Sequence, residues 1–191
     1  MANNITCSVL LLLIISMASA WAEPDNDTSR LIAALKNAVS DNHSFKDAYV
    51  GQVWLASMST PLSRWVKDDS DRIKLLTLIH QEATRAGLEP GLVLALIQVE
   101  SAFDNFAVSV AGARGMMQIM PFWKKEIGRD EDNLMDIATN LRYGTTILAH
   151  YIEIENGSII RGLARYNGSR GQTWYPKRVL IYWNKYWRMG S

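Results

Sequence analysis

Apolar residues recur at the three- and four-residue spacing of helices along most of the chain, and runs of alternating β-branched residues are few. One apolar stripe begins after the N-cap candidates Asp68, Asp69 and Ser70 and ends at Gly87. The stripe consists of Ile73, Leu76, Ile79 or His80, Ala83 and Ala86. Pro90 opens the next helix, at a position where its missing N–H costs nothing. The pattern predicts an all-α fold.

The same periodicity continues on both sides of these two helices. Before them, apolar residues at helical spacing indicate a short helical N-terminal extension over residues 21–66. After them, helices are expected near residues 117–127, 134–155, 158–166 and 176–188. We therefore expect one helical domain over residues 67–191, preceded by the extension.

The amino terminus has the pattern of a targeting segment. The run from Val9 to Met17 contains a single hydroxyl, and the small residues of Ala18-Ser19-Ala20 follow it. The run is too short to span a bilayer, so residues 1–20 are interpreted as a secretory signal peptide. The only cysteine, Cys7, precedes the apolar run and would be removed with the signal. We therefore expect an exported, soluble protein without a stable membrane anchor.

The charges of the chain are distributed unevenly. The formal net charge is +1, which argues against binding of polyelectrolytes through bulk charge. No Asp or Glu follows Glu155, so the remaining segment carries +7 and the rest of the chain −6. Its basic residues are Arg161, Arg165, Arg170, Lys177, Arg178, Lys185 and Arg188. Two interpretations stay open, a solvated helix surface and a face that attracts an anionic polymer.

Aromatic residues are concentrated in the same segment. Four of them lie at helical spacing and are interpreted as core packing, namely Tyr182, Trp183, Tyr186 and Trp187. Trp174 and Tyr175 precede Pro176 in an expected loop, which makes them the better candidates for stacking on a ligand.

One glutamate stands out from the apolar pattern. Residues 92–97 are apolar on every face, so their helix should be buried on all sides, and Glu100 is the first carboxylate after them. Burial and the negative end of the helix dipole both disfavour the charged form, so the pKa of Glu100 should be raised. A carboxylic acid still protonated near neutral pH can protonate a glycosidic oxygen. The alternative is a glutamate that faces solvent where its helix ends.

Other common catalytic patterns are missing from the sequence. His43, His80 and His150 are isolated, and no His-Glu-x-x-His or comparable metal-ligand spacing is present. The sequence contains no Gly-rich nucleotide loop, no Gly-x-Ser-x-Gly elbow and no cysteine besides Cys7. We therefore expect no metal and no cofactor, and an exported protein is not expected to bind nucleic acid.

Three short blocks follow one another in a specific order. Glu-Ser-x-Phe begins at Glu100, Gly-x-Met-Gln-Ile-Met-Pro at Gly115, and Ala-x-Tyr-Asn at Ala164. Together they resemble the soluble lytic transglycosylase (SLT) family, of the glycoside hydrolase family 23 type. The resemblance covers about residues 70–188 and implies a lysozyme-like α fold and cleavage of peptidoglycan.

The resemblance also implies roles for individual residues. It makes Glu100 the single catalytic acid and base. The residues it assigns to substrate binding are Ser109, Met117, Gln118, Met120, Tyr166 and Asn167. In this assignment Ser109 and Gln118 make hydrogen bonds to the N-acetyl group. The methionines form an apolar wall, and Tyr166 and Asn167 close the site. The alternatives are that the methionines are simple core and that Asn167 is a helix C-cap. Arg165 and the Gly168–Gly171 segment depart from the family pattern and leave the shape of the rim open.

The implied reaction uses one carboxylate, whereas ordinary glycosidases use two. By this resemblance, Glu100 protonates the oxygen between N-acetylmuramic acid and N-acetylglucosamine. It then takes a proton from the muramic 6-hydroxyl, which closes a 1,6-anhydro ring. Asp104 is the candidate for a second carboxylate, but its place at the expected helix exit favours capping or turn formation.

Two other functions remain open at the level of the sequence. One is a goose-type lysozyme-like hydrolase of the same bond, and the other is a non-catalytic glycan-binding scaffold. In each case we expect a monomer in the periplasm or cell envelope of a bacterium that binds peptidoglycan glycan strands. Partner proteins in an envelope machine are possible, and the sequence does not identify them.

Overall fold

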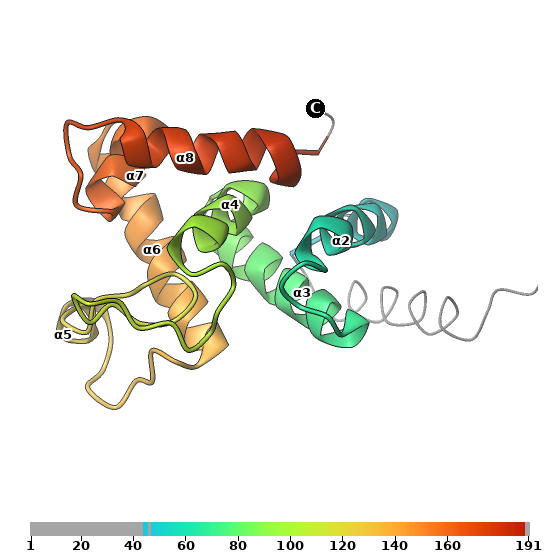
Figure 1. Ribbon diagram of the computed structural model, residues 1–191, viewed down its shortest axis with the longest axis horizontal. Coiled ribbons are helices and arrows are strands. Elements are labelled where there is room, and N and C mark those ends of the chain that lie inside the picture. The colour runs from blue at the N-terminus through green and yellow to red at the C-terminus, as the bar shows by residue number, and fades with distance from the viewer. Residues whose placement is uncertain (1–43, 46, 190–191) are drawn as a thin grey trace, which may run out of the picture.

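The computed structural model describes residues 44–45 and 47–189, and the fold of this part is built from helices (Figure 1). The elements are α2 (Ala48–Leu62), α3 (Asp69–Arg85), α4 (Pro90–Glu100), α5 (Trp123–Ile127), α6 (Ile137–Ile154), α7 (Ile159–Tyr166), α8 (Trp174–Tyr182) and a π-helical turn, η1 (Trp183–Trp187). Within the described ranges the only β-type pairing is two isolated bridges, from Arg114 to Val108 and to Ile119. The all-α class is confirmed. The expected signal peptide and residues 21–43 of the extension lie outside the described residues.

Several helices begin where the sequence predicts, because short polar side chains satisfy the first free backbone N–H groups. Asp68, Asp136 and Ser158 accept hydrogen bonds from the backbone nitrogens three residues later, at 2.9, 2.8 and 3.4 Å. At the start of α4, Glu89 accepts from the backbone nitrogen of Leu92 at 2.8 Å. These local bonds set the boundaries of α3, α4, α6 and α7.

The expectation of a helix over residues 117–127 is wrong in its first half, because only Trp123–Ile127 is helical. The preceding residues form a loop in which Arg114 and Ile119 exchange two backbone hydrogen bonds, at 3.0 and 2.9 Å. Gln118 has a φ of 51°, which lies in the left-handed region and interrupts a right-handed helix.

Helix α4 lies near the centre of the molecule, with α8 running beside it (Figure 1). Every residue of the apolar run 92–97 is at most 1% exposed, as the sequence predicts. The helix contacts α3, α8 and η1, which between them cover it. Because each large aliphatic side chain stabilises the fold by about 1.5–3 kcal/mol when buried, this helix is a rigid base for the residue at its end.

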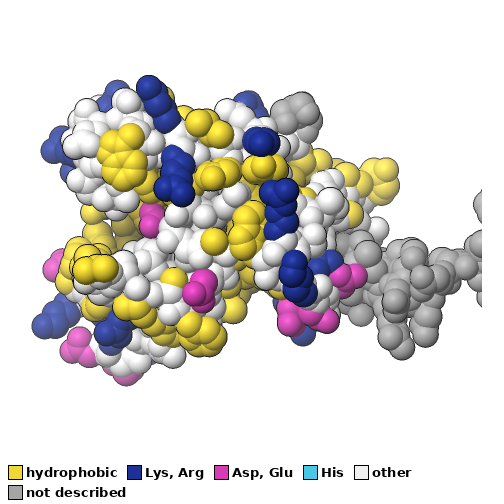
Figure 2. Space-filling view, viewed as in Figure 1, with side chains coloured by type: hydrophobic (Ala, Val, Ile, Leu, Met, Phe, Trp, Pro, Cys, Tyr) yellow, Lys and Arg dark blue, Asp and Glu magenta, His cyan; other side chains and the backbone are white. Residues whose placement is uncertain are grey.

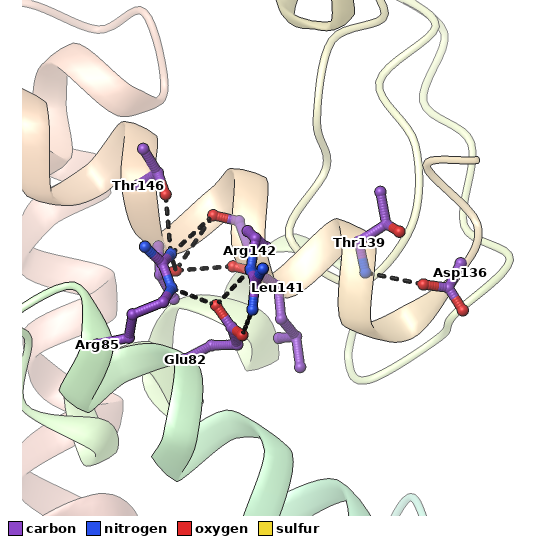
Figure 3. Close-up of polar contacts among 8 residues, drawn as sticks. Glu82, Arg85, Asp136, Thr139, Leu141, Arg142 and Thr146 are labelled. Carbon is purple, nitrogen blue, oxygen red and sulfur yellow. Dashed lines mark hydrogen bonds and ion pairs between the residues drawn. The ribbon is translucent and has the colours of Figure 1, made fainter. Parts of the chain in front are cut away.

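A buried ion-pair cluster joins α3 to α6 (Figure 3). The carboxylate of Glu82 is 2% exposed and accepts from Arg85 Nε and Arg142 Nη2, both at 2.6 Å. Burial acts to raise the pKa of Glu82, but the two guanidinium groups outweigh it and hold the pKa below its usual value. Arg85 also donates to the hydroxyl of Thr146 at 2.9 Å, so the two helices are fixed at their crossing.

The described part of the extension packs into the same core as the later helices. Helix α2 contacts α3 and η1, and its buried residues include Trp54 and Leu55. After α2, the ring of Trp65 lies 5.1 Å from that of Phe103 and 6.3 Å from that of Trp187. The boundary at residue 66 stays a prediction. Among the helices described, none is both long and apolar enough to span a membrane.

Candidate active site

Glu100 is the last residue of α4, and its side chain is half-buried at the end of the apolar helix. The hydroxyl of Tyr175 donates a hydrogen bond to its Oε1 atom. Burial raises the pKa of Glu100 to about 7, against the opposing effects of the Tyr175 hydrogen bond and the positive charge of Arg178. A carboxyl group with this pKa can both give and take a proton at neutral pH.

Tyr175 has a different position from the one that the sequence suggested. It is the second residue of α8 and is 2% exposed, so its ring is not accessible to a ligand. The interpretation of Trp174 and Tyr175 as a stacking pair is therefore wrong for Tyr175. Trp174 is 55% exposed, and its Nε1 donates to Gln172 at 2.6 Å, so its ring is held at the surface.

The chain turns sharply directly after Glu100. Ala102 and Phe103 have φ values of 50° and 64°, which place two consecutive residues in the left-handed region. The hydroxyl of Ser101 donates to the backbone oxygen of Met116 at 2.8 Å, and Phe103 is buried against Trp65 and Trp187. The Glu-Ser-x-Phe block thus fixes the end of α4 to the loop that begins near Gly115.

A buried asparagine holds that loop in place. The side chain of Asn140, in α6, accepts from the backbone nitrogen of Met117 at 2.8 Å and donates to the backbone oxygens of Arg114 and Leu134, both at 2.8 Å. Gly115 has a φ of 72°, and a Cβ atom there would lie 2.4 Å from the Asn140 amide. Sequence reasoning missed Asn140. A polar residue inside the stripe of an amphipathic helix was the available signal.

The residues of the Gly-x-Met-Gln-Ile-Met-Pro block differ in exposure. Met117 is 0% exposed and packs against Gly144, where a Cβ atom would meet its sulfur at 2.3 Å. Its side chain is therefore part of the core and does not form the expected wall, because it has no surface that a ligand could touch. Met120 is half-buried and keeps accessible surface.

Gln118 and Ser109 both hold backbone turns. The amide nitrogen of Gln118 donates to the backbone oxygens of Ala107 and Gly115, at 3.1 and 2.9 Å. The hydroxyl of Ser109 accepts from the backbone nitrogen of Ala113 at 3.0 Å. Both side chains are half-buried, so each has a structural partner and some exposed surface.

Tyr166 and Asn167 lie at the end of α7. The hydroxyl of Tyr166 donates to the backbone oxygen of Met117 at 2.7 Å, and its pKa is raised well above the usual value by burial and by the nearby charge of Glu100. The hydroxyl is thus engaged with the backbone, and the hydrogen bond to Glu100 comes from Tyr175. Asn167 is exposed and is the C-cap residue of α7, which agrees with the structural alternative for this residue.

Asp104 forms a local turn. Its Oδ1 atom accepts from the backbone nitrogen of Phe106 at 2.8 Å, and the residue is exposed. This is the turn role that the sequence favoured. Glu100 is accordingly the carboxylate whose surroundings suit proton transfer.

The region between the α7–α8 side and the α5 side is hollowed in Figure 2, and hydrophobic side chains line the visible part of the recess. The elements around Glu100 are α7 and α8 on one side of this recess and the loop before α5 on the other. Tyr175 and Tyr166 come from α8 and α7, and the loop before α5 carries Met117 and Met120. The arrangement places a neutral-pH acid at the end of a rigid helix beside apolar surface.

A family model described as "Transglycosylase SLT domain" matches residues 77–179. The membrane-bound lytic murein transglycosylase C of Actinobacillus pleuropneumoniae serotype 5b (strain L20) is 47% identical over 55 residues, 29% of this chain and 14% of that protein. The protein of the same description from Yersinia enterocolitica serotype O:8 is 32% identical over 117 residues, 51% of this chain and 32% of that protein. The chain thus spans a third or less of the length of these curated relatives.

Among solved structures, an X-ray structure of an inactive mutant of lytic transglycosylase Slt from Pseudomonas aeruginosa is similar to this chain. The similarity covers 83% of this chain and 25% of the other, with 26% sequence identity and a TM-score of 0.44.

Proposed function

Because the chain belongs to the transglycosylase SLT domain family, we propose that it is a peptidoglycan lytic transglycosylase, a lyase acting on polysaccharides. The bond cleaved is the β-1,4 bond between N-acetylmuramic acid and N-acetylglucosamine. The observation that carries the proposal is the Glu100 carboxyl group, half-buried at the end of α4 with its pKa raised to about 7. No cofactor takes part in the reaction.

In the first step, the protonated carboxyl group of Glu100 gives its proton to the glycosidic oxygen as the bond to the muramic anomeric carbon breaks. The Tyr175 hydrogen bond occupies Oε1, so Oε2 carries the transferred proton. The acetamido oxygen of the muramic residue stabilises the positive charge that develops at the anomeric carbon.

In the second step, the Glu100 carboxylate takes a proton from the 6-hydroxyl of the same sugar. The hydroxyl oxygen bonds to the anomeric carbon, the 1,6-anhydro ring closes, and the carboxyl group returns to its starting protonation state. An intramolecular hydroxyl held in this geometry has an effective concentration that can reach about 10⁵ M or more, so it outcompetes water. A pKa about 7 lets one group serve in both steps.

In this proposal the substrate contacts are made by the residues that the family resemblance assigns. Ser109 and Gln118 are half-buried, and in this proposal their polar groups bind the N-acetyl group. Met120 supplies an adaptable apolar contact, and Asn167 lies exposed at the end of α7. Tyr166 fixes the backbone of Met117, so its contribution is to shape the wall of the site.

The site of action in this proposal is the periplasm or cell envelope, since the substrate is the cell wall and residues 1–20 have the pattern of a signal peptide. The protein acts as a monomer on glycan strands. Nucleic acid is not a partner, and partner proteins in an envelope machine are not identified.

The test is the digestion of purified sacculi in water enriched in oxygen-18. We expect muramic products that carry no oxygen-18 and are about 20 Da lighter than products hydrolysed by the labelled water, because no water is added. Glu100→Gln should fold and bind glycan but lose several orders of magnitude in turnover, since an amide cannot deliver a proton. The matched control is Asp104→Asn, which should keep a substantial part of the activity because Asp104 serves a turn.

Labelled reducing ends would assign the protein to the lysozyme-like hydrolases. Near-normal turnover by Glu100→Gln would contradict the mechanism. An Asp104→Asn variant that is folded and as inactive as Glu100→Gln would favour a two-carboxylate reaction. Glycan binding without any product from the wild-type protein would favour a scaffold.

A further inference from the structure

A pocket of about 310 Å³ lies between the end of α6, helix α7 and the loop that leads to α8. Ile160 and Ala164 supply apolar surface from α7, and Gln172 and Thr173 supply polar surface from the loop. The charged residues of the lining are Arg161, Arg170 and Glu155. None of these residues has a role in the proposed reaction.

The charges around this pocket are not balanced. The carboxylate of Glu155 accepts from Arg165 at 3.0 and 2.8 Å and from Arg161 at 3.1 Å, and Arg170 lies 3.7 Å away. The hydrogen bonds and the charge of Arg165, then the Arg161 hydrogen bond and the Arg170 charge, outweigh the opposing effect of desolvation and hold the pKa of Glu155 below its usual value, so it is ionised at neutral pH. Three guanidinium groups share one carboxylate, which leaves the cluster with a net charge of +2.

The arginines differ in how firmly they are held. Arg165 is 23% exposed, makes two hydrogen bonds to Glu155 and lies over the ring of Tyr151, so it belongs to the structural part of the cluster. Arg170 is 70% exposed, and its contact with Glu155 is an ion pair of 3.7 Å, too long for a good hydrogen bond. Its planar set of donors faces the pocket edge with most of its hydrogen-bonding capacity available for a ligand.

The ligand class follows from these features. A guanidinium group matches a carboxylate with two parallel hydrogen bonds, and the apolar surface beside it suits a short aliphatic side chain. In peptidoglycan, groups of this kind are carried by the stem peptides, and the sugar rings that react carry none. Building on the proposed function, we propose that this pocket binds a carboxylate of the stem peptide, with Arg170 as the principal contact.

The pocket lies on the same two segments that carry the candidate active site. Ala164 lines the pocket two residues before Tyr166, and Thr173 lines it two residues before Tyr175. On a helix, positions two apart point to nearly opposite faces, so α7 separates the pocket from the acid. The pocket is thus distinct from the place where the sugars react, and a glycan strand at Glu100 would reach it only through a stem peptide that extends past α7.

The test compares two substrates in the Glu100→Gln background, where binding is measured without turnover. The substrates are intact sacculi and glycan strands from which an amidase has removed the stem peptides. Arg170→Ala should weaken binding to intact sacculi by about five- to tenfold, which is the effect of losing a charge-assisted hydrogen bond at a partly exposed site. Binding to the peptide-free strands should not change, because their only carboxylates are the lactyl groups that the amidase exposes on the sugars, and Arg170 contacts the peptide in this proposal.

The matched control is Lys177→Ala. It removes one positive charge from the same basic segment, is exposed on α8 and does not line the pocket. Equal losses of binding in Arg170→Ala and Lys177→Ala would mean that only net charge matters and would overturn the proposal. Equal losses on both substrates would overturn it as well, because the contact would then be with the sugars.

Different results would contradict the proposed stem-peptide site and the proposed activity. If the wild-type protein makes no anhydro product from either substrate, the proposed activity is wrong. The peptide-dependent difference in binding still decides the role of Arg170, since it is measured without catalysis. Kinetics of the otherwise wild-type Arg170→Ala protein add a second readout, with KM raised on intact sacculi and kcat unchanged.

Discussion

The protonation state of Glu100 depends on three effects that act on one carboxyl group. Burial at the end of α4 disfavours the carboxylate and raises the pKa, whereas the Tyr175 hydroxyl and the Arg178 charge favour the carboxylate and lower it. The result, a pKa of about 7, lies where an acid and its conjugate base are both available at neutral pH. Tyr175 thus tunes the acid as well as orienting it.

This balance predicts the effect of Tyr175→Phe. The tyrosine hydrogen bond stabilises the charged form of Glu100, so its removal should raise the pKa of Glu100 above the value of about 7. The reaction begins with the protonated form, so activity is lost as pH rises through this pKa. The alkaline limb of the pH–rate profile should therefore move to higher pH, while kcat at the optimum falls because the carboxyl group is no longer oriented.

The measurement is kcat/KM for anhydro-product formation between about pH 5 and pH 9, the range that brackets a pKa near 7. Tyr182→Phe is the control, because it makes the same change on the same helix at a half-buried position eight residues after Trp174. An alkaline limb that stays in place in Tyr175→Phe would contradict a direct influence of this tyrosine on the acid.

At the scale of elements, the predictable features were those set by neighbours in the sequence. The starts of α3, α4, α6 and α7 agree with local capping residues, and the burial of residues 92–97 agrees with their all-round apolar character. The raised pKa of Glu100 could be predicted for the same reason. The three family blocks gave the order of the site residues.

The features that the sequence did not reveal depend on contacts between distant segments. Tyr175 is 75 residues from Glu100, and no periodicity indicates that its hydroxyl reaches the acid. The loop before α5 depends on Asn140, which is 23 residues from Met117. In each case a polar side chain looked ordinary in its own helix, and its partner is a group on another element.

The loop before α5 provides the test at this scale. Asn140→Ala removes three hydrogen bonds of 2.8 Å and leaves buried backbone groups without partners. We expect the free energy of unfolding to fall by about 3 kcal/mol, because each unpaired buried group costs about 1–3 kcal/mol and the loop can relax toward water. Glycan turnover should fall as well, since Met117 carries the backbone oxygen that binds Tyr166.

Urea unfolding measures the stability change, and product formation from sacculi measures the loss of turnover. Asn133→Ala is the control, since Asn133 is exposed and its side chain accepts a local hydrogen bond from Met135 at 3.0 Å. If the two substitutions had equal effects on stability, the buried contacts of Asn140 would not hold the loop.

At the scale of the whole molecule, the basic carboxyl-terminal segment is only partly a free surface. Arg161, Arg165 and Arg170 gather around Glu155, so one of the seven positive charges is offset locally. The others lie on α8 and beyond, and Figure 2 shows Lys and Arg side chains over the side of the molecule that carries α8. Arg178, in particular, acts on Glu100 through its charge. The basic segment is therefore placed to attract an anionic polymer toward the acid.

This placement predicts that binding to sacculi depends on salt. Exposed charges more than about 10 Å apart are screened near 0.1 M salt, so attraction between the basic segment and the stem-peptide carboxylates should weaken as salt rises. We expect affinity of the Glu100→Gln protein for sacculi to fall by about tenfold between about 0.05 and 0.5 M sodium chloride. Peptide-free glycan strands are the control. They keep only the lactyl carboxylate that the amidase exposes on each muramic residue, so their affinity should fall less with salt than that of intact sacculi. Salt-independent binding to intact sacculi would mean that the arginines and lysines after Glu155 are ordinary solvated surface, and recognition would then rest on the contacts around Glu100 alone.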